Sequence, residues 1–333
     1  MNYTLHQLQV FAKVVQTKSI TRASEELYLS QPAVSIQLKN FQDQFDIPLT
    51  EVVGRQLYVT DFGKEIYAMA ERIINEVYAI NYKTQAYKGF LTGRLVISIV
   101  STGKYVMPYF LTEFLKENSG IDLVMDVTNK SKVINSLQNK EVDFALVSVL
   151  QEDIKVNKEN LMENQLFVIG NKDAKTPKHL ISKDELKEMP LIFREEGSGT
   201  RYVMENYFHK HKISLRKKME LTSNEAVKQA VLAGLGNSIM PLIGLRNSLV
   251  AGDLKIIPTA GFPIKSQWQL IWLKNKKLSP VAQAYIEYVK KNKTTILKDK
   301  FSWIDEIPTF KIANSEKKSK NNSPKKTNAW KSI

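Results

Sequence analysis

The sequence predicts an α/β protein with an all-α N-terminal head, and three observations lead to this fold class. Apolar residues in the first 60 positions recur at helical spacing. The chain between Gly63 and Tyr87 contains neither Gly nor Pro, which indicates one long helix. Beyond residue 93, short apolar runs alternate with amphipathic stretches, the pattern of a sheet covered by helices. At 333 residues the chain is long enough for two or three domains.

Composition excludes several classes of protein. A hydrophobic content of 43% is too high for a disordered chain, and the lack of cysteine excludes disulfides, thiol catalysis and thiolate metal sites. We find neither an apolar run long enough to span a membrane nor a signal peptide, so we expect an intracellular protein. The net charge of +14 favours a polyanionic partner. It does not identify a domain, because the first 60 residues are neutral overall and the lysine-rich tail after residue 310 carries much of the excess.

The head is expected to contain three helices. The first covers about Thr4–Gln16, and Ser19 is the N-cap of a second that continues to Leu27. Ser30 caps the third, with Pro32 in its first turn, where a missing N–H costs nothing. Two short helices joined by a tight turn are typical of a helix-turn-helix that reads a major groove. A three-helix core with a polar outer face is the alternative.

The amino-acid sequence of this segment favours the helix-turn-helix. SITRASEELYLSQPAVSIQLKNFQDQFDIPL, followed by GRQLYVTDFG, resembles the winged helix-turn-helix of LysR-type transcriptional regulators. The resemblance implies a base-reading turn and a wing residue at the minor groove, with the DNA-binding residues Gln31, Pro32, Ala33, Ser35, Gln37, Lys39 and Arg55. Two departures are Ile36, where the family often has Arg, and LTEV at Leu49–Val52 in place of LFER.

The long helix carries an apolar stripe with a period of 3.5 residues, which predicts a partner helix. The alternative is a helix packed on its own domain. The resemblance implies a dimerisation helix, followed by a hinge at Lys88–Gly93. The stripe consists of Ile66, Ala70, Ile73, Val77 and Ile80.

The pattern of the second half predicts a parallel α/β sheet in two lobes, with a ligand cleft at the carboxyl ends of the strands. The helices are expected after Pro108, at Val133–Leu137, at Ala226–Ala233 and at Pro280–Val289. The expected strands are Leu95–Val100, Leu123–Val127, Phe144–Val149, Leu166–Ile169, Leu191–Phe193, Met219–Leu221, Ser238–Met240 and Trp268–Leu273.

This half also resembles the LysR family, in segments such as VTNKSKVINSL, EVDFALVS and REEGSGTR. The resemblance implies an effector domain of the kind found in periplasmic solute-binding proteins. Gly197–Thr200 opening a helix could present N–H groups to an anion, with charge supplied by Arg194 and Arg201. An ordinary capped strand-to-helix turn is the alternative, and Glu196, where Pro is common, weakens the anion argument. The implied effector-binding residues are Ser101, Thr102, Thr128, Asn129, Ser148, Ser198, Gly199, Thr200 and Arg201.

The predicted boundaries follow from these segments. They are 1–61 for the winged helix-turn-helix, 62–92 for the dimerisation helix and hinge, 93–295 for the effector domain and 296–333 for a C-terminal extension with a disordered Lys/Asn/Ser tail. Lobe I takes about 93–164 and 269–295, and lobe II about 165–268. Phe301, Trp303 and Ile304 are expected to pack on the effector domain.

Within the family, SQPAVSIQLKNFQDQF is most similar to the RuBisCO operon regulators of cyanobacteria and plastids. That subfamily implies control of carbon-fixation genes, with a phosphorylated Calvin-cycle metabolite or NADPH as effector and no cofactor. The implied partners are promoter DNA, RNA polymerase and a second copy of the chain in a homodimer or tetramer. The abundance of Lys and Asn is typical of an AT-rich genome and favours the plastid stroma of a chloroplast, with a bacterial cytoplasm as the alternative.

Other classes fit the sequence less well. An enzyme would need a nucleophile or metal site, and the chain has neither a G-x-S-x-G elbow nor the spacing of a phosphate loop. His209 and His211 lie two residues apart in an expected helix and so face different directions. A solute-binding protein would not carry a DNA-reading head, and an architectural DNA binder would not need a two-lobed cleft.

Overall fold

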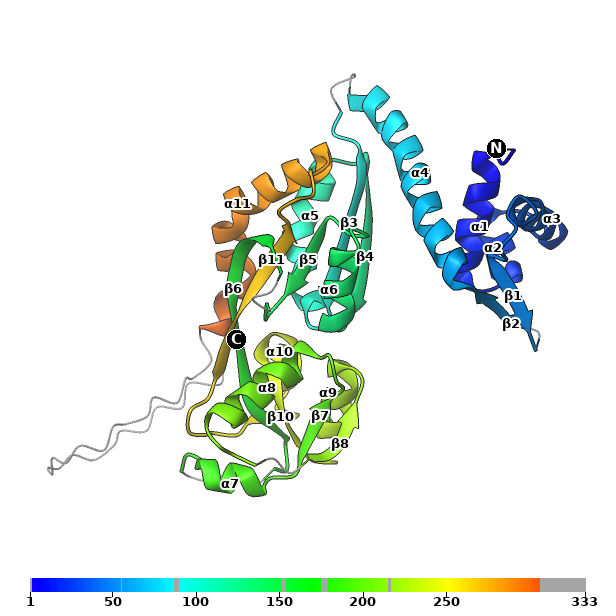
Figure 1. Ribbon diagram of the computed structural model, residues 1–333. Helices are drawn as coiled ribbons and strands as arrows, with labels where there is room; N and C mark the ends of the chain where they lie inside the picture. The colour runs from blue at the N-terminus through cyan, green and yellow to red at the C-terminus, as the bar shows by residue number, and fades with distance from the viewer. Residues whose placement is uncertain are drawn as a thin grey trace, which may run out of the picture. The chain divides into compact units, whose positions relative to one another are not determined.

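The computed structural model describes residues 2–54, 56–86, 90–150, 154–174, 179–214 and 217–305 (Figure 1). They form two compact units. The first unit holds Met1–Ile97, Phe110–Met125 and Asn275–Lys291, and the second holds Ser98–Tyr109, Asp126–Lys274 and the residues from Asn292 onward. Among the described residues, no helix is both long and apolar enough to cross a membrane.

The head contains the three expected helices and a two-stranded ribbon. The ribbon pairs its strands antiparallel from Thr50↔Val59 to Val53↔Gln56, which forms the wing. The helix caps were predicted correctly, because the Ser19 and Ser30 hydroxyls accept hydrogen bonds from backbone N–H groups three residues ahead. The elements are α1 (Leu5–Thr17), α2 (Ile20–Leu27), α3 (Gln31–Gln42), β1 (Thr50–Val53) and β2 (Gln56–Val59).

One apolar core joins the three helices of the head. Val34, Leu38 and Phe41 point inward from α3, and the Phe41 ring lies 5.0 Å from the ring of Phe11 on α1, measured between centroids. Since the inward positions follow helical spacing, the remaining residues of α3, most of them polar, form its outer face.

The long helix α4 (Asp61–Ala86) begins on this core, which corrects part of the expected dimerisation stripe. Ala70 is only 1% exposed and Ile66 packs beside it, so both are used within the head. Gly63 allows this approach, because a Cβ there would lie 2.0 Å from the Leu49 carbonyl oxygen. Ile80, by contrast, is 64% exposed. The first part of the periodic stripe therefore packs within the head and its later part is exposed, a difference that the sequence pattern does not reveal.

The second half forms one nine-stranded sheet with the order β4-β3-β5-β11-β6-β9-β7-β8 and β10 beside β6. The sheet is mixed, whereas a parallel sheet was expected. Strand β7 is parallel to β8 and β9, but β6 is antiparallel to β9, β10 and β11. The strands are β3 (Gly93–Val100), β4 (Ile121–Thr128), β5 (Phe144–Val147), β6 (Val156–Asn171), β7 (Leu191–Arg194), β8 (Lys217–Leu221), β9 (Asn237–Pro241), β10 (Leu254–Ile256) and β11 (Ile264–Leu273).

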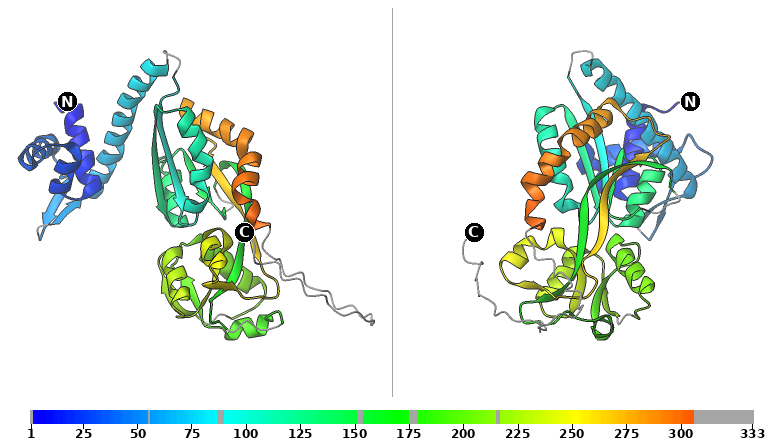
Figure 2. Two further views of the ribbon diagram at one scale, coloured as in Figure 1. Left: turned by 180° about the vertical axis from the view of Figure 1, so that it is seen from behind. Right: turned by 90° about the vertical axis from the view of Figure 1, so that its left-hand side faces the viewer.

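Two strands of this sheet are unusually long. β6 and β11 run side by side from Ile264↔Leu166 to Leu273↔Val156, with a register shift between Trp268 and Gln269 (Figure 2). The boundaries predicted between the lobes lie inside these two strands. Each strand therefore continues through a position where the sequence indicated a change of lobe.

Five of the helices that cover the sheet begin close to their expected positions, whereas α7 and α10 were not predicted. One of them, α11, was predicted to end at Val289 but continues to Phe301. Phe301 is buried, and Trp303 and Ile304 pack on a buried apolar cluster that includes Phe167 and Val231, as expected. The helices are α5 (Met107–Glu117), α6 (Lys130–Gln138), α7 (Lys183–Glu188), α8 (Gly199–Lys210), α9 (Asn224–Leu232), α10 (Arg246–Val250) and α11 (Pro280–Phe301), and short 3-10 turns lie at Gly103–Tyr105, Leu242–Gly244 and Ser302–Ile304.

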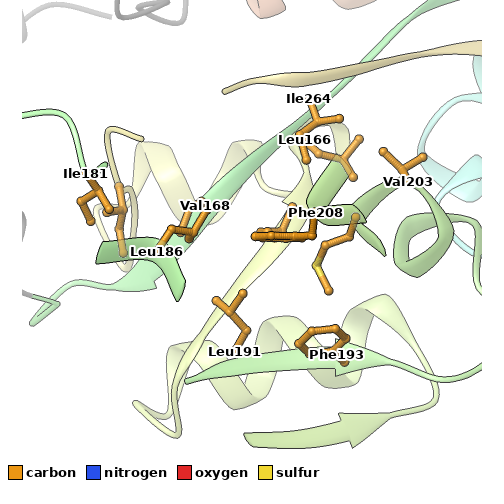
Figure 3. Packing of buried hydrophobic residues seen from close by; sticks show 12 residues of the cluster. Leu166, Val168, Ile181, Leu186, Leu191, Phe193, Val203, Phe208 and Ile264 are labelled. Atoms are coloured by element: carbon orange, nitrogen blue, oxygen red, sulfur yellow. The ribbon is translucent and has the colours of Figure 1, made fainter. Parts of the chain in front are cut away.

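A separate apolar cluster fixes α8 on the sheet (Figure 3). Val203 and Phe208 of α8 meet Leu166 of β6 and Leu191 and Phe193 of β7. Because both ends of the loop between β7 and α8 are anchored in this way, the loop residues 195–198 have a defined position.

Candidate functional site

The exposed face of α3 carries most of the residues expected to read DNA. Gln31, Pro32, Ser35 and Lys39 are exposed, and Ala33 and Gln37 are half-buried. The Ser30 hydroxyl accepts a hydrogen bond from the Ala33 N–H at 3.3 Å, which holds the first turn of α3 in shape. Base edges in a major groove are read by such amide and hydroxyl side chains at the start of a helix.

Ile36 lies on the same face and is 57% exposed. An apolar side chain at this position can contact the methyl group of thymine but cannot bind a phosphate. The departure from the common family residue therefore replaces a side chain that can make an ionic contact with one that can make only an apolar contact.

The wing is present, but its predicted DNA contact is not described. Arg55 lies outside the described residues. Gly54, beside it, has a φ of +57°, the left-handed conformation that suits a two-residue hairpin loop. Val52 and Val53 are exposed on the ribbon that leads to this loop.

The residues expected to bind an effector all lie at the ends of strands in the second unit. Ser101 and Thr102 follow β3, Thr128 ends β4 with Asn129 next to it as the N-cap of α6, and Ser148 follows β5. Ser198, Gly199, Thr200 and Arg201 follow β7 at the start of α8, where Ser198 is the N-cap. A Cβ built on Gly197 would lie 2.7 Å from the Ser131 hydroxyl, and the Ser131 N–H donates to the Gly197 carbonyl at 3.3 Å. The starts of α6 and α8 are thus in contact.

Ser101 belongs to a buried hydrogen-bond cluster. Its hydroxyl accepts from the Arg194 guanidinium at 3.1 Å and from the Asn224 amide at 2.9 Å. Arg194 is 4% exposed and makes a two-pronged ion pair with Glu195, at 2.7 and 2.8 Å. The Asn224 side-chain oxygen is buried without a hydrogen-bond partner. The sequence analysis did not identify Asn224, because an Asn at the start of an expected helix is normally interpreted as an N-cap.

A second link joins the same two segments. The Tyr105 hydroxyl lies 3.1 Å from the Glu225 carboxylate. Burial, with the negative charge of Glu225, raises the pKa of Tyr105 to about 12. Burial also raises the pKa of Glu225, but hydrogen bonds from Gln229, Lys228 and Tyr105 outweigh it and lower the pKa to about 2. The pair therefore stays a phenol bound to a carboxylate at neutral pH.

Arg201 is already bound by carboxylates. Its guanidinium lies 2.6 Å from Glu205, 2.8 Å from Glu220 and 3.8 Å from Glu196. The hydrogen bond with Glu205 raises the pKa of Arg201 further, although partial burial opposes this. The expectation that Arg194 and Arg201 offer their charge to an anion does not match this geometry, because carboxylates occupy both guanidinium groups.

A pocket of about 470 Å³ lies where α6 and α8 begin. Of the expected effector residues, Ser198 and Arg201 line it. Lys130, Ser131 and Tyr202, which the sequence analysis did not name, also line it, as do the carboxylates of Glu196 and Glu205. Lys130, Ser131 and Tyr202 lie in the segments NKSKV and GTRY, directly after the expected effector residues Asn129 and Arg201, and this proximity could have identified them. Across the described residues, no group of three His, Asp or Glu could hold a metal ion.

Family comparisons agree with this geometry. The family described as "Bacterial regulatory helix-turn-helix protein, lysR family" matches residues 5–64, and "LysR substrate binding domain" matches residues 88–293. The chain belongs to the LysR family of transcriptional regulators. The expected winged helix-turn-helix and α/β effector domain are thereby confirmed at the level of the family and fold.

Several relatives of this LysR-type regulator are well matched over most of its length. The RuBisCO operon transcriptional regulator of Allochromatium vinosum is 38% identical over 290 residues, 87% of this chain and 96% of the relative. The HTH-type transcriptional activator CmpR of Synechocystis is 35% identical over 289 residues, 86% of this chain and 95% of the relative. Their names describe transcription regulators and not enzymes.

Solved structures of LysR-type regulators resemble the chain as well. The regulatory domain of Synechocystis CcmR in complex with 2-PG is 35% identical, with a TM-score of 0.58, and covers 61% of this chain and 98% of its own. Full-length CbnR complexed with its target DNA has a TM-score of 0.64 and covers 86% of this chain and 99% of its own. At 19% identity, CbnR shows the fold alone.

Proposed function

We propose that this LysR-type regulator controls transcription of a RuBisCO operon in response to a small phosphorylated acid. One observation carries the proposal: 38% identity to a RuBisCO operon regulator extends over 87% of the chain, through both the head and the effector half. Promoter DNA, an effector and a second copy of the chain are the partners that this function requires, with RNA polymerase as the machinery it acts on.

The head supplies the sequence reading. The amide of Gln31 can pair with an adenine edge, and the hydroxyl of Ser35 can bind either a donor or an acceptor on a base. Lys39, farther along the exposed face of α3, suits a phosphate contact that positions the helix. We assign Arg55 the wing contact, on the strength of the family resemblance.

The second part of α4 supplies the contact between two copies. Ile73 and Ile80 are exposed and Val77 is half-buried. Together they continue an apolar stripe beyond the part that packs on the head. A paired helix at this position would place two reading heads over two half-sites, as a symmetric operator requires.

The effector half supplies the response. The resemblance to the 2-PG complex supports a phosphorylated acid such as 2-phosphoglycolate. The pocket at α6 and α8 has a mostly polar lining, in which the carboxylates of Glu196 and Glu205 lie beside hydroxyl and cationic side chains. NADPH, which also carries phosphate groups, is the competing effector. A ligand can change DNA binding only if it favours one arrangement of the protein over another, so the response must appear as a difference in affinity.

The compartment follows from the origin of the gene. With 22 Asn and 40 Lys but only eight Arg, the composition favours an AT-rich genome such as that of a plastid. We therefore propose the plastid stroma. The matched relatives from Allochromatium and Synechocystis are bacterial, and in a bacterium the corresponding place is the cytoplasm.

A mobility-shift titration on DNA upstream of the RuBisCO genes tests this function. The full chain is expected to retain this DNA in the presence of competitor, and 2-phosphoglycolate or NADPH should change the apparent affinity. Gln31→Ala should relax selectivity at one base pair, and Gln44→Ala, which changes an exposed glutamine just after α3, serves as the matched control. Retention no stronger than on shuffled DNA would refute the proposed target, and an affinity that neither metabolite alters would refute the effector class.

A further inference from the structure

The outer face of α3 presents a large apolar side chain at its centre. Ile36 is 57% exposed, and since an exposed isoleucine is not unusual by itself, its position on the helix is what matters. It lies two residues from both Val34 and Leu38, a rotation of about 200° around a helix, and those two side chains are buried in the core of the head. Ile36 therefore points away from that core, at the centre of the face that a helix-turn-helix presents to the major groove.

The neighbours of Ile36 on this face are mostly uncharged. Pro32 and Asn40 lie one turn before it and one turn after it, and both are exposed. Pro32 adds a second apolar surface to that of Ile36. Lys39 is the only charged residue of α3, so the centre of the face offers apolar contacts in place of ionic ones.

The charge of the whole head gives independent support. The first 60 residues carry as many acidic as basic side chains. One of the cations, Lys13, forms an ion pair with Glu26 at 2.9 Å. Since a head without net charge gains little from general attraction to phosphates, its binding to DNA depends more heavily on contacts with the bases.

Among the base edges of the major groove, only thymine presents a methyl group. The edges of guanine, adenine and cytosine are read through hydrogen-bond donors and acceptors. An isoleucine can bond to none of these polar atoms, and a polar atom that it covered would lose its water without compensation. Contact with the 5-methyl group of thymine, by contrast, removes two apolar surfaces from water at once.

We propose that Ile36 is a specificity-determining residue, which selects thymine by its 5-methyl group at one position of each half-site. The inference rests on the proposed function and deepens it, because it names a base that the head selects beside those that Gln31 and Ser35 read. Loss of the methyl contact is expected to cost about the transfer free energy of one methylene group, which is about a fourfold loss of affinity per half-site. In a symmetric dimer the loss applies twice, which gives about 15-fold.

Substitution of deoxyuridine for thymidine tests the contact, because it removes only the methyl group and leaves the base pair with adenine unchanged. The operator is one that the full chain selects from a pool of random DNA, so the test does not depend on the RuBisCO target. Each thymine is replaced in turn, and the affinity of the full chain is measured by mobility shift. At one thymine of a half-site, the wild type should lose affinity about fourfold and Ile36→Ala should lose none.

Two further variants separate the methyl contact from other effects. Ile47→Ala is the matched control, because Ile47 is an isoleucine of the head that is 54% exposed and lies outside α3. This variant should keep the wild-type sensitivity to deoxyuridine. Ile36→Arg should lose the sensitivity and bind DNA with a steeper dependence on salt, since the new cation can release counterions. Because both positions are exposed, all three substitutions should leave the melting temperature unchanged.

The outcomes are distinct. A loss at one thymine per half-site in the wild type and in Ile47→Ala, but not in Ile36→Ala, would support the role of Ile36. An equal loss in the wild type and Ile36→Ala would overturn that role, because the methyl group would then act through another contact or through the shape of the DNA. A wild type that deoxyuridine weakens at no position would overturn it as well. If the selected operator does not occur upstream of the RuBisCO genes, the proposed target alone is overturned, because the same titration still decides the role of Ile36.

Discussion

Replacement of Arg194 by methionine is expected to destabilise the second unit by about 3–5 kcal/mol. The guanidinium makes two bonds to Glu195 and one to Ser101, and its side chain is almost fully buried. Removal of the cation leaves the Glu195 carboxylate, itself 15% exposed, without compensation. Most of the expected loss of stability comes from the unpaired charge of the mostly buried Glu195 carboxylate, and less comes from the three lost hydrogen bonds.

A second variant measures how much of this loss comes from the unpaired carboxylate. Arg194→Met combined with Glu195→Gln removes both charges, so its cost should fall to about 1–2 kcal/mol, set mainly by the hydrogen bond that Ser101 loses. The control is Lys265→Met, which breaks an exposed pair with Glu163 at 3.0 Å and should cost at most about 1 kcal/mol.

Urea unfolding followed by tryptophan fluorescence measures these differences. The four tryptophans of the chain, Trp268, Trp272, Trp303 and Trp330, all follow the head, so the signal reports on the effector half. A single variant no less stable than Lys265→Met would refute the reasoning. Equal instability of the single and double variants would do so as well, because it would show that the stranded carboxylate is not the cause.

Three further predictions concern other surfaces. Gln31→Ala should lose about 1–3 kcal/mol at one base pair, and an equal loss on random DNA in a footprinting titration would contradict base reading. Ile80→Glu should shift sedimentation toward the monomer, because a charge on an exposed apolar stripe opposes helix pairing, and an unchanged dimer would exclude this surface. The Ser182 N–H and His179 lower the pKa of Glu185 from 4.5 to about 2. The stabilisation that the Glu185 carboxylate gives to the start of α7 is therefore complete above about pH 4.5 and is lost as the pH falls toward 2. A carboxyl NMR titration of Glu185 with a midpoint near 4.5 would contradict this prediction.

Local signals made the head predictable from sequence. Ser19, Ser30 and Pro32 each act within a few residues of their own position, and the caps observed are the caps expected. The apolar positions of α1 and α3 follow one helical period because a single core receives them.

Long-range pairing explains what the sequence did not reveal. The first part of β6, VNKENLMENQ, is mostly polar, and it forms a strand because β11 pairs with it from about a hundred residues away. Arg201 was expected to face an anion, but one of its carboxylates, Glu220, comes from β8 and only the fold brings it near. The Tyr202 ring, which lies 4.0 Å from the Lys130 ammonium, likewise comes from a different helix.

The end of α11 has a practical consequence for dissecting this protein. The family match stops at residue 293, yet Phe301 is buried against Tyr109, and Trp303 covers an apolar cluster and stacks on Arg246. A fragment cut at the family boundary would uncover these apolar faces, and exposed faces of this kind promote aggregation. An effector-domain fragment for ligand screening should therefore extend to at least residue 305, and a purification tag belongs beyond it.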